Sequence, residues 1–272
     1  MPSPTAITVS QLSRLVGTPA APVIVDVCPD KDFDADPRLI PTAFRHPSDH
    51  VAVLAAELRG SKVVVVCQEG LRLSQGAAAL LRAHGISAEN LEGGKLAWRD
   101  AGEPLLPVAN LPRTGQWGQT LWVTRQRPKI DRIACPWLIR RFVDPRAQFL
   151  FVAPSEVLSV AERFDATPFD VEGVFWSHRG DRCTFDTMLE ELALETEALK
   201  RLAMIVRGAD TNRHGLSPQA AGLLAISVGL SRMYRDDLEQ LEAGMMLYDA
   251  LFRWSRDAVD EGHDWPTAPI RS

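Results

Sequence analysis

The sequence predicts an α/β domain with a parallel sheet, followed by a helix-rich α+β domain. At 272 residues, the chain is long enough for roughly two domains of average size. In its first half, β-branched runs alternate with helical patterns, as is typical of a parallel sheet with right-handed crossovers. The aromatic content changes between the halves, since only Phe33, Phe44 and Trp98 precede position 111.

We expect the first domain over residues 1–108, as a five-stranded parallel sheet flanked by helices. Its clearest strands are continuous apolar runs, which indicate burial on both faces. Its clearest helices show a helical spacing of Ala, Val and Leu, and Gly85 follows the second as a stop. The strands cover residues 23–27 and 62–66, and the helices cover residues 48–58 and 74–84.

We expect a linker over residues 109–116, because the stretch around it is rich in proline and has no clear period. The second domain then covers residues 117–265 and is mostly helical. One of its helices starts at Ser217-Pro218, an N-cap followed by a proline at the first helical position. Further helices are expected at 187–206 and 238–252, and strands at 120–124 and 148–152.

Composition excludes several classes of protein. Apolar residues make up 46% and charged residues 24%, so disordered and fibrous chains are excluded. No uncharged apolar stretch approaches the ~18 residues that a membrane span needs. The N-terminus lacks the basic and apolar regions of a signal peptide, and the four cysteines contain no CxxC pair. We therefore expect a cytoplasmic protein with free thiols and no membrane partner.

Cys67 is the first candidate catalytic residue. It directly follows the strand at 62–66 and precedes a helix, which is where open α/β sheets place ligands. The helix dipole and the N–H groups from Gln68 to Leu73 favour a thiolate there. Arg72 can bind an anionic substrate. The alternative is a buried structural cysteine at a strand end.

Residues 1–107 resemble a rhodanese-like sulfurtransferase domain. Four segments carry the resemblance: Val23-Ile-Val-Asp-Val27, Arg38-Leu-Ile-Pro-Thr-Ala43, Cys67-Gln-Glu-Gly-Leu-Arg72 and Gly93-Gly-Lys-Leu-Ala-Trp98. The resemblance implies that Cys67 carries a persulfide, with Arg72 as a second catalytic residue. It also implies a persulfide-binding loop made by Gln68, Glu69, Gly70, Leu71 and Leu73.

This chain departs from the rhodanese pattern at two positions that affect the sulfur donor. Cys28 stands where the family usually has arginine, and Leu39 replaces the usual histidine. Glu69 within the loop also disfavours a bare thiosulfate dianion. Cys28 ends the first strand at the same sheet edge as Cys67, so it is a candidate resolving thiol. The alternative for Cys28 is a small apolar packing residue.

Two segments of the second half carry candidate binding residues. Residues 125–146 hold seven Lys or Arg against two Asp, a patch that could bind an oxyanion or nucleic-acid phosphates, or could simply be a solvated surface. His178, Cys183 and Asp186 are metal-compatible ligands, and Asp210 with His214 forms a second group. The alternative for His178 is a hydrogen-bonded structural role.

Residues 117–260 resemble the C-terminal domain of the chromate-resistance ChrB family. The resemblance rests on residues 131–145, 177–186 and 205–211 and on Tyr248-Asp-Ala-Leu251. It implies a link to chromate resistance. The candidate cofactor comes from the donor types instead, since His, Asp and thiolate together suit a divalent metal such as zinc or iron. Members commonly have histidine where this chain has Arg207, which removes a ligand. We therefore favour an oxyanion pocket, for chromate or sulfate, lined by His178 with Arg179, Arg182 and Arg207, over a metal site made by His178, Asp186, Asp210 and Cys183.

Two functions remain open at this point. The first is an enzyme, a thiosulfate- or persulfide-type sulfurtransferase, in which Cys67 takes sulfur from a small-molecule donor and passes it to a thiol acceptor. The second is a chromate- or oxyanion-responsive sensor or regulator with a catalytically silent rhodanese module. Nucleic acid is a partner only in the second case.

Overall fold

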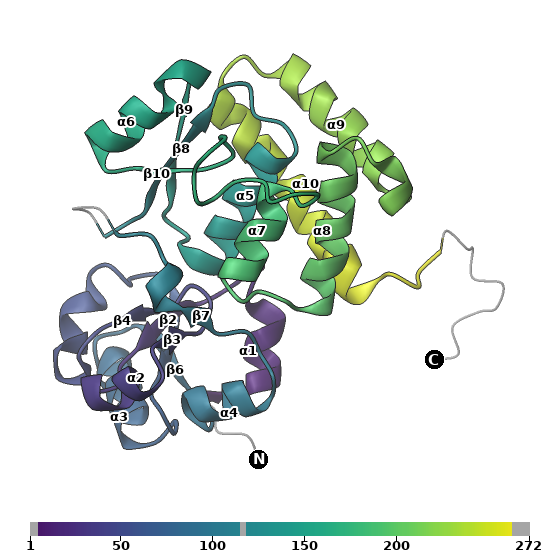
Figure 1. Cartoon of the computed structure of the whole chain (residues 1–272). Helices are drawn as coiled ribbons and strands as arrows, with labels where there is room; N and C mark the ends of the chain where they lie inside the picture. Colours follow the sequence, from purple (N-terminus) through teal and green to yellow (C-terminus); the bar gives the residue numbers. More distant parts are fainter. Residues whose placement is uncertain (1–4, 115–117, 263–272) are drawn as a thin grey trace.

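The computed structural model describes residues 5–114 and 118–262. Residues 115–117, at the junction of the expected linker and the second domain, lie outside the described residues. The N-terminal half and the C-terminal half form two adjoining bodies, with the chain crossing between them after β7 (Figure 1). No helix among the described residues combines the length and apolar character needed to cross a membrane.

The N-terminal half contains the expected five-stranded parallel sheet. Its strand order is β1-β6-β5-β2-β4, and every pairing in it is parallel. A separate antiparallel pair, β3 with β7, lies beside it. The strands are β1 Ala6–Ile7, β2 Val23–Asp26, β3 Arg38–Leu39, β4 Phe44–Arg45, β5 Lys62–Val66, β6 Ser87–Leu91 and β7 Leu106–Pro107.

Helices cover both faces of this sheet. They are α1 Val9–Leu15, α2 Asp30–Ala35, α3 Arg72–Ala83 and α4 Gly94–Asp100, with 3-10 segments η1 Ser48–Ala55 and η2 Val108–Asn110. The expected helix at 48–58 is a 3-10 helix over Ser48–Ala55, which starts after Pro47 and is followed by turns. Gly85 has a φ of 78° directly after α3 and its cap His84, as expected of a helix stop.

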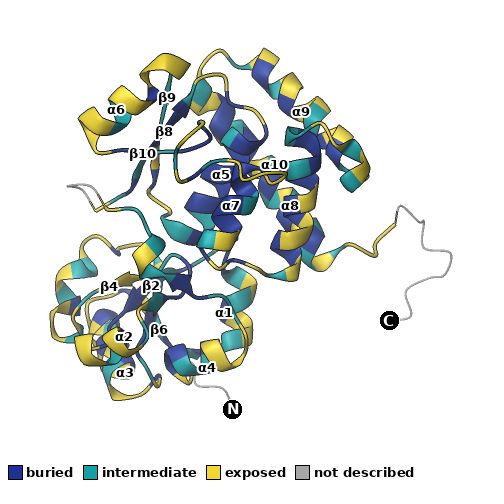
Figure 2. Cartoon of the chain, in the orientation of Figure 1, coloured by how far each residue is buried: buried dark blue, intermediate teal, exposed yellow. Residues whose placement is uncertain are grey.

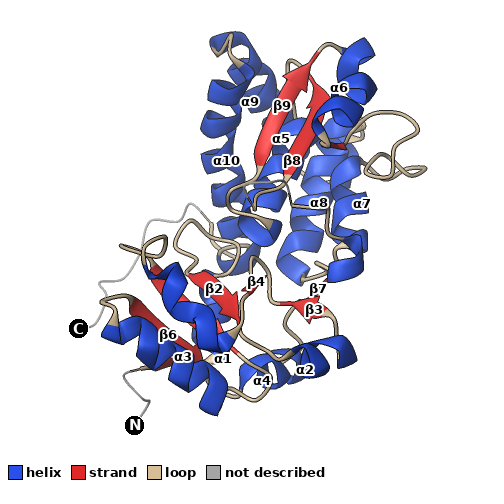
Figure 3. Cartoon of the chain, turned by 90° about the vertical axis from the view of Figure 1, so that its left-hand side faces the viewer, coloured by secondary structure: helices blue, strands red, loops and turns tan. Residues whose placement is uncertain are grey.

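The C-terminal half contains a smaller parallel sheet of order β10-β8-β9, packed among helices (Figure 3). Its strands are β8 Leu121–Arg125, β9 Gln148–Val152 and β10 Thr167–Pro168. Its helices are α5 Asp131–Leu138, α6 Val157–Phe164, α7 Thr184–Glu191, α8 Glu197–Asp210, α9 Ala220–Met233 and α10 Asp237–Asp257, with η3 Ile139–Val143, η4 Pro154–Glu156 and η5 His214–Leu216. The helix-rich α+β class is confirmed.

Two helix boundaries differ from the sequence expectation. The single helix expected at 187–206 is two helices, because the chain turns between α7 and α8, where Ala193 has a φ of 52°. The helix expected from Ser217-Pro218 begins at Ala220 instead, and the carbonyl of Ser217 accepts a hydrogen bond from its first amide at 3.1 Å.

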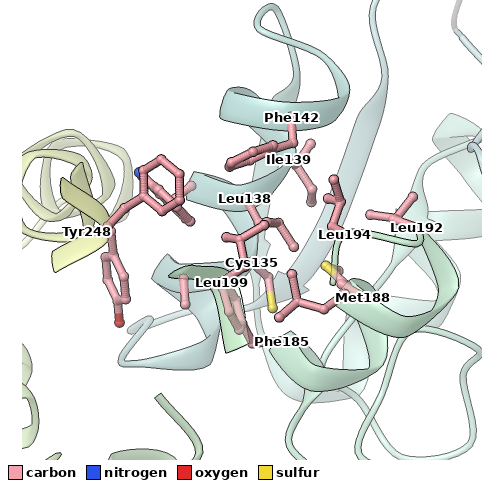
Figure 4. Close-up of a cluster of buried hydrophobic side chains, with 14 of the residues drawn as sticks. Cys135, Leu138, Ile139, Phe142, Phe185, Met188, Leu192, Leu194, Leu199 and Tyr248 are labelled. Carbon is pink, nitrogen blue, oxygen red and sulfur yellow. The ribbon is translucent and has the colours of Figure 1, made fainter. Parts of the chain in front are cut away.

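One hydrophobic cluster crosses the junction between the two halves, so the second domain does not have a core entirely separate from that of the first. Alternate residues of the first sheet face different clusters, as the period of a strand requires. Val25 and Val65 face a cluster confined to the N-terminal half. Ile24 and Val64 face a second cluster, which continues into the C-terminal half and includes Phe252 of α10. The C-terminal part of this cluster lies between α5, α7, α8 and α10 (Figure 4), and buried residues cover both halves along the junction (Figure 2).

Candidate functional site

Cys67 lies at the carboxyl end of β5, in the loop before α3, as the sequence predicts. Its side chain is 4% exposed, and its Sγ donates a hydrogen bond to Ser74 Oγ at 3.1 Å. Among the described residues, no loop N–H donates to this sulfur. The predicted ring of amides around Cys67 is therefore wrong, because the thiol turns toward the first turn of α3.

Two glycines fix the shape of this loop. Lys95 N donates to Cys67 O and Leu96 N donates to Gln68 O, each at 3.0 Å. Gly94 has a φ of 60°, and a Cβ there would lie 2.2 Å from Cys67 O. Gly70 has a φ of 70°, and a Cβ there would lie 2.4 Å from the carbonyl of the last residue of β6. The loop and the start of α4 thus pack backbone against backbone, which only glycine allows.

The outer side of the loop is open and polar. Gln68 is half-buried, and its Oε1 is buried with no hydrogen-bond partner among the described residues. Glu69, Leu71 and Arg72 are exposed, and Arg72, the first residue of α3, has no charged partner among the described residues. Leu73 is half-buried. The loop therefore offers a free cation and an unsatisfied acceptor beside the thiol.

Cys28 lies at the same sheet edge as Cys67, and both belong to one buried cluster. Its amide donates to Asp26 Oδ1 at 2.8 Å. Burial, and then the neighbouring Asp26 carboxylate, raise the pKa of the Cys28 thiol well above its usual value. A hollow of about 420 Å³ opens beside it, lined by Cys28, Arg45 and His46 among others, with Cys67 outside the lining. The resolving role of Cys28 stays a prediction.

A second group of polar side chains gathers around His178 in the C-terminal half. His178 Nε2 lies 3.3 Å from Asp170 Oδ1, 3.3 Å from Asp210 Oδ2 and 3.5 Å from Asp131 Oδ2. Asp131 begins α5, Asp170 follows β10 and Asp210 ends α8. Four separate parts of the chain therefore converge on one point, where α5, α7 and α8 meet (Figure 1).

The two buried aspartates are held by further hydrogen bonds. The carboxylate of Asp131, 1% exposed, accepts from Thr184 N at 2.6 Å and from Phe185 N at 3.4 Å, so it sits at the N-terminus of α7. Asp170 accepts from Thr184 Oγ1 at 3.0 Å. Arg125 and Arg132 pair with its other oxygen at 2.9 and 3.2 Å.

The side chains of this group shift one another's pKa values. Hydrogen bonds to Asp131, Asp170 and Asp210 raise the pKa of His178 to about 12. Burial raises the pKa of Asp131 to about 7. Burial also raises the pKa of Asp170, but its hydrogen bonds with His178 and Arg125 outweigh that effect and hold it below the usual value. His178 is therefore a cation among carboxylates in this arrangement.

Three of the sequence-predicted candidates lie apart from this group. Asp186 accepts hydrogen bonds from Cys183 N at 3.0 Å and from Cys183 Sγ at 3.3 Å, which caps α7. Arg207 approaches the other oxygen of Asp186 at 3.7 Å. Burial raises the pKa of the Cys183 thiol. Only His178 and Asp210 of the predicted metal ligands come together, and Asp186, Cys183 and Arg207 form a capping group instead.

The predicted oxyanion pocket is not formed by the three arginines. Arg179 pairs with Glu191, Arg182 pairs with Glu190, and Arg207 pairs with Asp186. Each guanidinium thus has its own carboxylate, which leaves no shared positive site for an anion.

The basic segment at 125–146 is also largely neutralised within the fold. Arg125 and Arg132 bind Asp170, Arg140 binds Glu242, and Arg141 binds Asp249 through two hydrogen bonds. Arg127 binds the carbonyls of Ser231 and Tyr234. Arg127, Arg140 and Arg141 therefore tie this segment to α9 and α10, and Arg125 and Arg132 tie it to Asp170 after β10, so these arginines do not form an open phosphate-binding surface.

Sequence reasoning missed Asp131 and Asp170, although the rule that found Cys67 applies to both. The carboxyl ends of parallel strands gather at one edge of a sheet. Asp170 lies two residues beyond β10, and Asp131 begins the helix that follows β8. Two unusual backbone angles accompany them, a φ of 53° at Asp170 and of 44° at Ile130, a β-branched residue that rarely adopts it.

Comparison with known proteins finds a family match in each half of the chain. Residues 8–101 match the family model of the rhodanese-like domain, and residues 122–255 match that of the C-terminal domain of ChrB. Protein ChrB of Cupriavidus metallidurans is 35% identical over 172 residues, which cover 58% of this chain and 51% of that protein. The chain therefore spans about half the length of this curated relative.

Solved structures resemble the N-terminal half. A rhodanese-related protein of Thermoplasma volcanium is 22% identical, covering 37% of this chain and 96% of that one, with a TM-score of 0.33. A rhodanese-like domain protein of Staphylococcus aureus is 31% identical, covering 35% and 90%, with a TM-score of 0.31. A thiosulfate sulfurtransferase of Pseudomonas aeruginosa is 25% identical, covering 38% and 19%, with a TM-score of 0.33.

Proposed function

We propose that this chain, which carries a rhodanese-like domain followed by a ChrB C-terminal domain, transfers sulfane sulfur through a persulfide on Cys67. The observation that carries the proposal is the position of Cys67, at the carboxyl end of the central strand β5 and before the N-terminus of α3. This position suits a thiolate nucleophile.

The proposed reaction has two steps that conserve electrons overall. The Cys67 thiolate attacks the outer sulfur of a thiosulfate- or persulfide-type donor, a sulfur–sulfur bond forms at Cys67, and the donor leaves as sulfite or as a thiolate. An acceptor thiolate then attacks the outer sulfur and regenerates the Cys67 thiolate. Arg72, exposed and without a charged partner among the described residues, binds the anionic donor at the loop.

The other cysteines are less suited to this chemistry. Burial raises the pKa of the thiols of Cys28, Cys135 and Cys183, so each holds its proton at neutral pH and is a poor nucleophile. All four cysteines are free, which suits a cytoplasmic setting, where disulfides are rare.

Donor access requires a small movement of the loop. Cys67 is 4% exposed in this arrangement. The unsatisfied Gln68 Oε1 gains a partner when a donor or water enters. The exposed Glu69 favours a persulfide of lower charge over a thiosulfate dianion.

The ChrB match supports an association with chromate resistance. The alternative function in that setting is a chromate- or oxyanion-responsive sensor or regulator with a silent rhodanese module. The burial of Cys67 favours this alternative, whereas the paired arginines of the C-terminal half count against an oxyanion or nucleic-acid surface there. Salt-dependent DNA binding without sulfur transfer supports the alternative and contradicts the enzyme.

A sulfur-transfer assay on the full chain tests the proposal. Thiosulfate and glutathione persulfide serve as donors, and cyanide or a small thiol as acceptor. We expect Cys67→Ser to abolish transfer, and Arg72→Ala to raise KM for the donor with a smaller effect on kcat. Cys183→Ser, a buried thiol of the other half, is the control and keeps the activity. Equal activity of wild type and Cys67→Ser contradicts the proposal.

A further inference from the structure

We infer that Asp131, Asp170, His178 and Asp210 form a binding site for one divalent transition-metal ion. This site is independent of the sulfur-transfer proposal, and its ligand set differs from the one that the sequence suggests. One oxygen or nitrogen from each of Asp131, Asp170 and His178 lies within 4.8 Å of the others, and Asp210 Oδ2 lies 3.3 Å from the same imidazole nitrogen.

The spacing of these atoms matches a coordination shell. Nε2 of His178 is separated from the three carboxylate oxygens by 3.3, 3.3 and 3.5 Å. A tetrahedral shell with metal–ligand bonds of about 2.1 Å has edges of about 3.4 Å between its ligands. The three separations from Nε2 match such edges, and the ligand atoms of Asp131, Asp170 and His178 also lie within 4.8 Å of one another. Asp210 is not part of that mutually close set, so its carboxylate must move toward the ion, and Nε2 must lose its proton.

The arrangement without an ion leaves one of its carboxylates, that of Asp210, with few partners. One N–H of His178 faces three carboxylates and can donate a good hydrogen bond to only one of them at a time. Among the described residues, Asp210 has no other hydrogen-bond or ion-pair partner than His178. Asp210 is also the last residue of α8, where the helix dipole disfavours a negative charge. A cation at the centre resolves both features, whereas a purely structural cluster explains neither.

The surroundings supply what a metal site needs beyond its direct ligands. Thr184 N orients Asp131, and Thr184 Oγ1 and Arg125 orient Asp170. Hydrogen bonds of this kind fix ligand geometry in metal sites. A hollow of about 530 Å³ adjoins the group, lined by Asp170 and His178 together with Ser177 and Glu172 among others. Solvent or a small molecule can complete the coordination of the ion from this side.

The donor set defines the class of metal. Three carboxylate oxygens favour a hard ion, and one imidazole favours the first transition series over calcium or magnesium. Cys183 is not among the ligands, since its Sγ binds Asp186, so a soft, thiolate-dependent ion is not expected. The site fits Mn²⁺, Fe²⁺ or Zn²⁺, and Mn²⁺ is the probe of choice because its binding is seen directly by electron paramagnetic resonance.

The experiment is a titration of chelator-treated full-length protein with Mn²⁺, followed by the loss of the six-line signal of the free ion. We expect one Mn²⁺ per chain. His178→Gln and Asp210→Asn should each weaken binding at least tenfold. These two side chains make the fewest contacts outside the group, so their variants should fold, which circular dichroism checks. Zn²⁺ added to the loaded protein should displace the Mn²⁺.

Two control variants test whether Mn²⁺ binding is specific to this group of side chains. Asp181→Asn removes an exposed aspartate of the same loop, paired with Arg213, and should bind Mn²⁺ like wild type. Cys67→Ser should also bind normally, so failure of the sulfur-transfer proposal leaves this one standing. Absence of stoichiometric Mn²⁺ and Zn²⁺ binding, or wild-type affinity in folded His178→Gln and Asp210→Asn, overturns the inference.

Discussion

The two parallel sheets of this protein end in different chemistry. The carboxyl edge of the N-terminal sheet presents Cys28 and Cys67 within an apolar cluster. The corresponding region of the C-terminal sheet presents Asp131 and Asp170 with His178, supported by arginines and helix amides. The same place in the topology thus carries a thiol in one half and carboxylates with an imidazole in the other.

This difference shows that the sheet topology sets the position of a site, whereas the residues at that position set its chemistry. The sheet edge gathers whatever side chains follow the strands. Apolar packing tolerates a neutral thiol, whereas carboxylates at such an edge need cations or hydrogen-bond donors to remain charged. We therefore expect substitutions that crowd the backbone to disturb the N-terminal sheet edge most. We expect substitutions that change charge to disturb the C-terminal edge most.

The largest expected effect is crowding of the Cys67 loop by Gly94→Ala. The new methyl group would lie 2.2 Å from Cys67 O and 2.4 Å from Gly70 N, so the loop must move. We expect a loss of about 2–4 kcal/mol of unfolding free energy and at least a tenfold loss of sulfur transfer, measured by denaturant unfolding and by the transfer assay.

The matched control for this change is Gly76→Ala in α3, where nothing lies within 4 Å of the new Cβ. It should stabilise the protein by about 0.5–1 kcal/mol, because alanine favours a helix. Equal effects of the two variants would show that the contact between the loop and α4 has no special role.

A somewhat smaller effect is expected where the two halves meet. A Cβ at Gly17 would lie 2.3 Å from Phe142 Cζ, and Gly17 has a φ of 77°. Gly17→Ala should therefore cost about 1–3 kcal/mol. Gly60→Ala, which has a similar φ but open space, should cost less. A second, separate unfolding transition in Gly17→Ala would argue that the halves do not share a cooperative core.

The two buried thiols of the C-terminal half should resist alkylation at alkaline pH. Burial raises the pKa of Cys135 and Cys183, so their thiolates stay scarce in the folded protein well above pH 8.5. We expect iodoacetamide at pH 8.5 to modify these two residues only after unfolding. Because their folded-state pKa values are raised, stability should fall as the pH rises above the unfolded value. Rapid labelling of Cys183 in the native protein would contradict its placement.

The smallest effect is expected for the arginines that the sequence placed in an anion pocket. Arg182 and Glu190 are both about half exposed, and such ion pairs contribute little to stability. Arg182→Ala should change the unfolding free energy by no more than about 0.5 kcal/mol. It should also leave Mn²⁺ binding unchanged, and a loss of binding would place Arg182 nearer the site than the structure does.

The sequence predicted the first sheet better than the second site. Continuous valine runs identify β5 without reference to the rest of the chain, because burial on both faces leaves a local pattern. The cluster around His178 forms because α5, α8 and the chain after β10 pack together. The spacing of residues in the sequence does not predict that these three segments come into contact. Asp186 was predicted as a ligand because it lies in the same recognisable motif as His178, yet its carboxylate caps α7. Asp170 is equally distant from His178 in the sequence but lies outside that motif.

The shared core was also beyond a local pattern. The sequence predicted two domains joined by a proline-rich stretch, and this stretch does connect the halves. Contact between Phe142 and the end of α1, which places a ring against Gly17, depends on how the halves dock. Composition along the chain does not report docking of this kind.

The most direct test of the account is the location of sulfur after reaction of the full-length protein with a persulfide donor. Trapping of thiols and persulfides by alkylation, followed by peptide mass spectrometry, identifies which cysteine has gained one sulfur atom. The account predicts this gain on the peptide that contains Cys67, with none on the peptides of Cys135 and Cys183. A protein that gains no sulfur at Cys67, or gains it equally in Cys67→Ser, would contradict the account.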